Sequence, residues 1–196
     1  MLKQTEQIID KYLLAFDELN VLMQASYQES TDFEKNVRNI TEDLYSCLWM
    51  AYKQGIDAVS EMLECSILLD DNRREQVIYQ EIDGMDFTER IYDHVSKSDI
   101  SGLVALAQSE YHRVFNTAMA DGADFVGLSK QVSKTWITVG DDKVRETHQY
   151  LEGVTIPIEE KFYTVDGDSA LYPSDFQYAE NNVNCRCIVE YRQERR

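Results

Sequence analysis

The chain of 196 residues has few of the residues that interrupt helices. It has two prolines, Pro157 and Pro173, and six of its eight glycines lie after position 100. Proline and glycine are the least favourable residues in the interior of a helix. The first hundred residues therefore contain little that would break a long helix, and irregular structure is expected in the C-terminal part.

The sequence also lacks the features of several protein classes. No apolar run approaches the roughly 20 residues of a membrane span, and the N-terminus has no apolar core of a signal peptide. Basic residues are scarce, because 19 Lys and Arg stand against 36 Asp and Glu, a net charge of −17. Phosphate binding needs clustered cations, so a role in coating DNA or RNA is disfavoured. We expect a soluble intracellular protein with no membrane partner.

Common enzyme signatures are absent as well. The chain has no Gly-rich phosphate loop, no Gly-x-Ser-x-Gly and no His-Glu-x-x-His. Its Asp166-Gly167-Asp168 segment lacks the other ligands of a calcium loop and is interpreted as a turn. The four cysteines do not form a disulfide-scaffold pattern.

Hydrophobic periodicity predicts an acidic helical part over residues 1–128, with 24 acidic and 10 basic side chains. Thr31 and Glu34 have the capping-box pattern of a helix start. The acidic faces are interpreted as solvated surface or as a docking surface for a basic partner. The expected helices cover residues 4–26, 31–63, 73–82, 86–95 and 103–125.

Residues 129–196 are of mixed character and predict a small α+β core. A helix is expected over residues 141–151, with Asp141 as its N-cap and Gly153 ending it. Strands are expected over residues 134–139, 162–165 and 185–191. The predicted fold class is α+β, a mainly α-helical N-terminal part joined to this core.

The core contains residues that suit a metal site. On the expected helix, Asp141, Arg145 and His148 share one face through spacings of four and three. In a strand, residues two apart point to the same side, so Cys185 and Cys187 present their sulfurs together. If strand and helix pack together, His148 and the two cysteines meet with Asp141 nearby, a sound set of ligands for zinc.

The same residues allow other interpretations. The cysteines could be reduced and packed beside a hydrogen-bonded histidine, or form a disulfide or redox pair. A bound metal is expected to be structural, because no well-placed general base stands out beyond Asp141 or Glu146. His94 and His112 lie on predicted helices and are interpreted as packed or exposed, not as ligands.

The core also resembles the phage Mu protein F-like family, which comprises phage head morphogenesis or minor head proteins. The similarity covers about residues 103–190 and is specific from Lys134 onward, where many spaced residues agree in order. These residues are Lys134, Trp136, Asp141, Arg145, His148, Gly153, Tyr172, Pro173, Asp175, Asn184, Cys185, Arg186 and Cys187.

The resemblance implies a minor component of a tailed-phage head that associates with portal or capsid subunits. Such a protein would be found in the virion head, and in the host bacterial cytoplasm during assembly. The acidity of residues 1–128 argues against direct nucleic-acid binding by that part, and its long helices are compatible with self-association. The family's suspected metal-binding residues fall on Asp141, Arg145, His148, Cys185 and Cys187, which implies a structural zinc.

Two alternatives to a head protein remain. The first is a small phage-encoded hydrolase or transferase that uses the face formed by Asp141, Arg145 and His148. An enzyme needs these groups in a cleft, whereas a structural cluster buries them. The second is an acidic inhibitor or binding module, which the charge of residues 1–128 supports.

Overall fold

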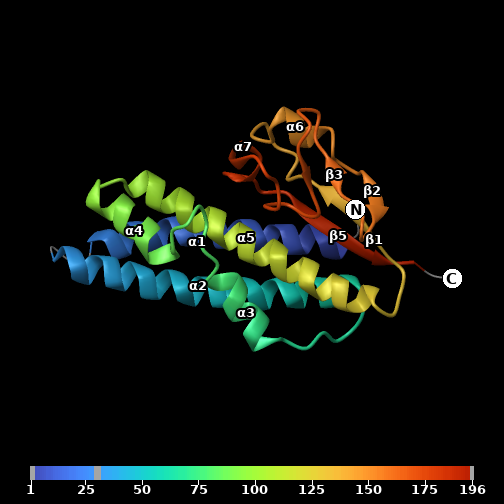
Figure 1. The fold of residues 1–196 in the computed structure, drawn as a ribbon, viewed down its shortest axis with the longest axis horizontal. Helices are drawn as coiled ribbons and strands as arrows, with labels where there is room; N and C mark the ends of the chain where they lie inside the picture. Colours follow the sequence, from blue (N-terminus) through green and yellow to red (C-terminus); the bar gives the residue numbers. More distant parts are fainter. Residues whose placement is uncertain (1–2, 29–31, 195–196) are drawn as a thin grey trace.

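The computed structural model describes residues 3–28 and 32–194 of the chain. It confirms the α+β prediction, since long helices form the N-terminal part and a small antiparallel sheet lies in the C-terminal part (Figure 1). None of the helices in these residues is long and apolar enough to cross a membrane. The helices are α1 Lys3–Gln28, α2 Phe33–Met62, α3 Asp71–Ile78, α4 Phe87–Ser96, α5 Ile100–Gly127, α6 Glu146–Gln149 and α7 Ala179–Asn182.

Aspartates start four of the helices in the N-terminal part. Side chains of Asp32, Asp70, Asp86 and Asp99 accept hydrogen bonds from backbone N–H groups in the first turns of α2 to α5. Such caps satisfy donors that have no partner within the helix. The helix predicted from Thr31 thus begins at Phe33 with Asp32 as its cap, while Thr31 lies outside the described residues. Part of the acidic composition therefore serves to begin helices.

The middle of α5 is buried by the rest of the molecule. From residue 110 to residue 120, every residue except Arg113 is buried. Helices α1, α2 and α4 pack against α5, and so do strands β1 (Val132–Ile137) and β5 (Ile188–Gln193). Gly55 of α2 permits the close approach of α2, because a Cβ there would lie 2.4 Å from the carbonyl oxygen of Phe115. The two parts of the chain thus share one hydrophobic core.

Replacing Gly55 with alanine tests this close contact. The added methyl group has to push α2 and α5 apart, so Gly55→Ala is expected to lower the free energy of unfolding by about 1–3 kcal/mol. Gly127→Ala is the control, because its Cβ would make an ordinary 3.7 Å contact with Ile158. Urea unfolding would compare both variants with the wild type. Equal stability of Gly55→Ala and the wild type would contradict the packing described here.

The C-terminal part is built on a three-stranded antiparallel sheet in the order β2-β1-β5, with β2 at Thr155–Pro157. Strand β1 pairs with β5 so that Trp136 lies opposite Val189 and Ile137 opposite Ile188. A second antiparallel pair joins β3 (Phe162–Tyr163) to β4 (Ser169–Ala170). The turn between them contains Gly167 with φ of +88°, which confirms the turn predicted at residues 166–168.

Two sequence predictions in this part are wrong. The helix expected over residues 141–151 is reduced to α6, because Asp141 accepts a hydrogen bond from the Lys143 N–H and pairs with Arg186. These bonds hold residues 141–145 outside a helix. The strand expected from Cys185 begins at Ile188, since its partner β1 ends at Ile137. Cys185 and Cys187 therefore lie in an unpaired extended segment before β5.

Candidate metal centre

Three buried side chains meet between α6 and the segment before β5. Nδ1 of His148 lies 3.5 Å from the Sγ of Cys185 and 3.5 Å from the Sγ of Cys187. All three ligand atoms lie within 4.8 Å of one another. Because side chains alternate along an extended segment, the two sulfurs point to the same side and Arg186 points away. We call His148, Cys185 and Cys187 the His/Cys cluster; it could hold a metal ion.

The spacing of the cluster agrees with zinc coordination. Zinc bonds of about 2.3 Å to sulfur and about 2.0 Å to nitrogen, at tetrahedral angles, place the nitrogen roughly 3.5 Å from each sulfur. The observed distance from His148 Nδ1 to both sulfurs is 3.5 Å. One N–H group cannot point well at two sulfurs, whereas one metal ion can bind all three atoms. The donor set and its spacing therefore fit zinc.

Aromatic rings fix the orientation of the His148 imidazole. Phe176 stacks on it with ring centroids 5.2 Å apart, and Trp136 meets it edge-on at 5.4 Å. Trp136 of β1 has no exposed surface and packs against the His148 ring inside the core. The Nε2 atom of His148 is buried and has no hydrogen-bond partner among the described residues. The ring is thus held by packing, with Nδ1 directed at the sulfurs.

The electrostatic environment favours one thiolate in the cluster. Burial opposes ionisation of Cys185, but a hydrogen bond with Cys187 and the nearby imidazoles of His112 and His148 outweigh it and lower its pKa. The hydrogen bond with Cys185, together with burial, raises the pKa of Cys187. A metal ligand must be deprotonated, so the low pKa of Cys185 prepares this sulfur for metal binding.

Two other predicted site residues hold the loop that carries the cysteines and lie outside the cluster. Asp141 forms two hydrogen bonds of 2.8 and 2.9 Å with Arg186, which lower the pKa of its carboxyl group. Arg145 donates a hydrogen bond to the carbonyl of Val183. Asp141, Arg145 and His148 therefore do not share a helix face, because the helix expected to carry them is absent over residues 141–145.

The remaining motif residues shape the core around the cluster. Lys134 is buried and donates a 2.8 Å hydrogen bond to the carbonyl of Leu171, while the N–H of Leu171 donates to Asp175. Burial lowers the pKa of Lys134 to about 8. Gly153 and Asn184 have φ values of +75° and +57°, so both occupy left-handed turns. These residues position backbone and do not contact the sulfurs of the cluster by any hydrogen bond described here.

Two further motif residues and one histidine lie between the helical part and the core. Thr117 of α5 donates a 3.5 Å hydrogen bond to Tyr172, and Pro173 follows Tyr172 in the same loop. His112 of α5 is buried beside Cys185. The sequence predicts a packed or exposed His112, and no local spacing relates this residue to the cysteines more than 70 positions away.

The space around the cluster is small. The cavity directly over it, lined by His148, both cysteines and the neighbouring loop, measures about 10 Å³. A groove of about 570 Å³ lies outside, between α1, α5 and the cationic side chains Lys143, Arg145 and Arg186, and reaches Cys185 at its edge. The cluster itself is therefore enclosed and not set in an open cleft.

The fold and the cluster define an α-helical protein with a small α+β core that encloses a His/Cys/Cys group. The chain matches the family described as phage Mu protein F like protein over residues 72–190, more than half of its length. The protein belongs to this family, which confirms the resemblance seen in the sequence. The match begins in α3, well before residue 103, and so includes α5 as well as the core. No solved structure matches the chain.

Two curated proteins share shorter segments with the chain. The NAD(+)–arginine ADP-ribosyltransferase EFV of Enterococcus faecalis is 39% identical over 62 residues, 32% of this chain and 12% of that protein. The minor head protein GP7 of Bacillus phage SPP1 is 28% identical over 85 residues, 43% of this chain and 28% of that protein. The matched segments therefore span less than a third of either relative.

The pairing of Asp141 with Arg186 predicts that Asp141 is not a metal ligand. Asp141→Asn should weaken zinc binding by no more than about 10–100-fold, the cost of losing a partner outside the ligand set. Competition with a chromophoric chelator would measure this affinity. Cys185→Ser is the reference variant that removes a cluster sulfur. A loss for Asp141→Asn as large as that for Cys185→Ser would contradict the arrangement.

Proposed function

We propose that this protein is a minor head protein of a tailed phage or prophage, which joins portal or capsid subunits during procapsid assembly and remains in the virion. The observation that carries the proposal is the family match over residues 72–190. The similarity to a protein named as a minor head protein, GP7 of phage SPP1, supports it.

The helical part is the proposed contact with head subunits. It carries most of the negative charge, with 24 acidic and 10 basic side chains over residues 1–128. Apolar side chains are exposed among the acidic ones, including Leu14 and Val21 on α1 and Met50 on α2. A surface of this kind suits a protein partner or a second copy of the chain better than it suits nucleic acid, because phosphates repel its charge.

We also propose that the His/Cys cluster binds zinc and that the zinc is structural. Nitrogen and sulfur donors are the ligands of structural zinc sites, which are closed to solvent. His148, Cys185 and Cys187 are 1%, 4% and 3% exposed. Bound zinc would join α6 to the segment before β5, across 37 positions of sequence between His148 and Cys185.

An enzymatic function has less support than a structural one. The segment shared with the ADP-ribosyltransferase EFV is 12% of that protein, so the similarity does not carry its activity to this chain. Catalysis needs room for a substrate beside the reacting groups. The cavity over the cluster measures about 10 Å³, and His148 does not line the groove of about 570 Å³ outside it. The burial of His148 and its separation from Asp141 favour a structural role instead.

Mass spectrometry of purified particles tests the head-protein proposal. We expect this chain in both procapsids and mature virions of the parent phage, at a few copies per particle relative to the portal protein. Particles from a phage that lacks the gene are the control for contaminating cell protein, and expression from a plasmid should restore the signal. Presence in the infected-cell lysate with absence from both kinds of particle would contradict the proposal and favour an enzyme or an acidic inhibitor.

Metal removal tests the zinc proposal. We expect one zinc per purified chain, and chelation should lower the midpoint of thermal unfolding by at least about 5 °C, because structural zinc contributes several kcal/mol. Cys187→Ser should lose the zinc and show the same lowered midpoint. Cys47→Ser is the matched control, since Cys47 is a free thiol outside the cluster. An unchanged midpoint after chelation, with Cys187→Ser as stable as the wild type, would exclude a structural metal.

A further inference from the structure

The groove of about 570 Å³ beside the His/Cys cluster has no role in the functions proposed above. Its volume lies within the range of about 300–1,000 Å³ that is usual for ligand-binding sites. Helices α1 and α5 form one wall of the groove, and the segments before α6 and before β5 form the other. The groove therefore lies where the helical part meets the core.

Cationic side chains gather on the core wall of this groove. Lys143, Arg145 and Arg186 line it, and Asp17 of α1 is the acidic residue on the opposite wall. The lining thus carries three positive charges and one negative charge, in a chain that has 19 basic and 36 acidic residues. We call this groove the cationic groove; its charge is opposite to that of the molecule as a whole.

Two of these cations are not neutralised by a carboxylate of the chain. Arg186 pairs with Asp141 through two hydrogen bonds. Arg145 donates to the carbonyl of Val183, and its Nη1 has no hydrogen-bond partner among the described residues. Lys143 is exposed and, although its charge acts on Asp141, it forms no ion pair within the part of the chain that the structure describes. Positive charge therefore remains available to a ligand.

The helical wall adds apolar surface and hydrogen-bonding groups. Leu13 of α1 is half-buried, and Phe16 beside it is 7% exposed. Gln108 of α5 donates a 3.1 Å hydrogen bond to the carbonyl of Phe16, which joins the two helices at the groove. The hydroxyl of Ser109 has no hydrogen-bond partner among residues 3–28 and 32–194. A ligand in the groove thus meets cations on one side and an apolar side chain and a hydroxyl on the other.

This lining fits an acidic peptide better than it fits nucleic acid. The net charge of −17 repels a polyphosphate as a whole. Nucleic-acid sites also stack bases on aromatic rings, and the ring of Phe16 is too buried to offer a face. A peptide with a few carboxylates carries less charge, forms charge-assisted hydrogen bonds with Lys and Arg, and can place an apolar side chain on Leu13.

We propose that the cationic groove binds an acidic peptide segment of another protein, with its carboxylates toward Lys143 and Arg145 and an apolar side chain toward Leu13. This site differs from the acidic helical surface proposed to contact head subunits, because its charge is opposite. The proposal depends neither on the identity of the partner nor on a bound metal. A partner held there contacts α1, α5 and the core at the same time.

Fluorescence anisotropy with the full chain tests the proposal. The probes are short fluorescein-labelled peptides that contain two glutamates at different spacings, with leucine and glycine at the other positions. We expect binding at low salt that weakens as salt is added, because salt screens exposed charges. Peptides with glutamine in place of glutamate, or with serine in place of leucine, should bind more weakly.

Charge variants with matched controls locate the binding site. Lys143→Glu should weaken peptide binding by more than about tenfold, because it places like charges together. Lys161→Glu is the control, since Lys161 is an exposed lysine outside the groove. Asp17→Asn should strengthen binding by about two- to fivefold, as the loss of an exposed like charge predicts, whereas Asp10→Asn on the same helix should not. A gain in affinity cannot result from misfolding.

Several outcomes would overturn the proposal. Equal affinities of Lys143→Glu and Lys161→Glu would place the peptide elsewhere, and no binding of any peptide to the wild type at low salt would leave the groove without its ligand. Tighter binding of labelled oligothymidine than of the peptides would assign the groove to nucleic acid. Sedimentation of the chain alone tests a second copy as the occupant, which dimerisation of the wild type but not of Lys143→Glu would indicate.

These results are independent of the head-protein proposal. Peptide binding is measured on the purified chain, whereas the mass spectrometry of particles asks whether the chain is part of a head. A chain that is present in virions but binds no acidic peptide would contradict the inference about the groove alone. A chain that binds the peptide through Lys143 but is absent from particles would contradict the head-protein proposal alone.

Discussion

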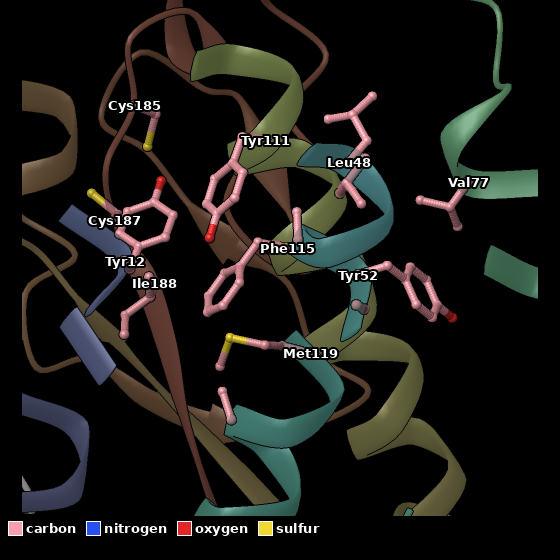
Figure 2. Packing of buried hydrophobic residues seen from close by; sticks show 14 of the residues in the cluster. Tyr12, Leu48, Tyr52, Val77, Tyr111, Phe115, Met119, Cys185, Cys187 and Ile188 are labelled. Atoms are coloured by element: carbon pink, nitrogen blue, oxygen red, sulfur yellow. The ribbon is translucent and has the colours of Figure 1, made fainter. Parts of the chain in front are cut away.

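The burial of the middle of α5 is the constraint on which the rest of the structure depends. Protein interiors are close-packed, so a helix shared by two parts of a chain sets the position of both. One side of α5 receives α2 across Gly55, and another receives β1 and β5 of the core. Figure 2 shows the result, with Phe115 and Met119 of α5 packed among side chains from α1, α2 and β5. Tyr12 and His112 reach the cysteines because of this packing.

Positively charged side chains gather beside the His/Cys cluster, although the chain as a whole is acidic. The groove beside the cluster is lined by Lys143, Arg145 and Arg186, within a chain of net charge −17. Arg145 donates a hydrogen bond to the carbonyl of Val183, and Arg186 donates to the carboxylate of Asp141. These two contacts tie the segment before α6 to the segment before β5. The charge of Arg145 also favours the thiolate of Cys187, against the stronger effects of Cys185 and burial. The residues of the family motif thus divide into a few that could bind metal and more that build the loops around them.

Local patterns predicted the helical part well and the core less well. The helix ends agreed to within a few residues, because apolar periodicity is a local signal. The caps Asp32 of α2 and Asp86 of α4 were recognised only in the structure. The prediction of a helix over residues 141–151 was wrong, because only α6 forms there. Asp141 accepts a hydrogen bond from the Lys143 N–H and pairs with Arg186, 45 positions away, instead of capping a helix. The predicted start of the last strand at Cys185 was wrong, because β5 begins at Ile188, opposite the end of its partner strand β1 at Ile137.

The sequence by itself determined the fold class, the family and the side-by-side placement of the two cysteine sulfurs, since each depends on spacing along the chain or on motif order. Only the tertiary structure decided that His148 faces both sulfurs, that Asp141 faces Arg186 instead, and that His112 lies beside Cys185. These contacts join residues 37 to 73 positions apart. Local sequence periodicity cannot predict such contacts, because they form only when α5 packs between the helical part and the sheet.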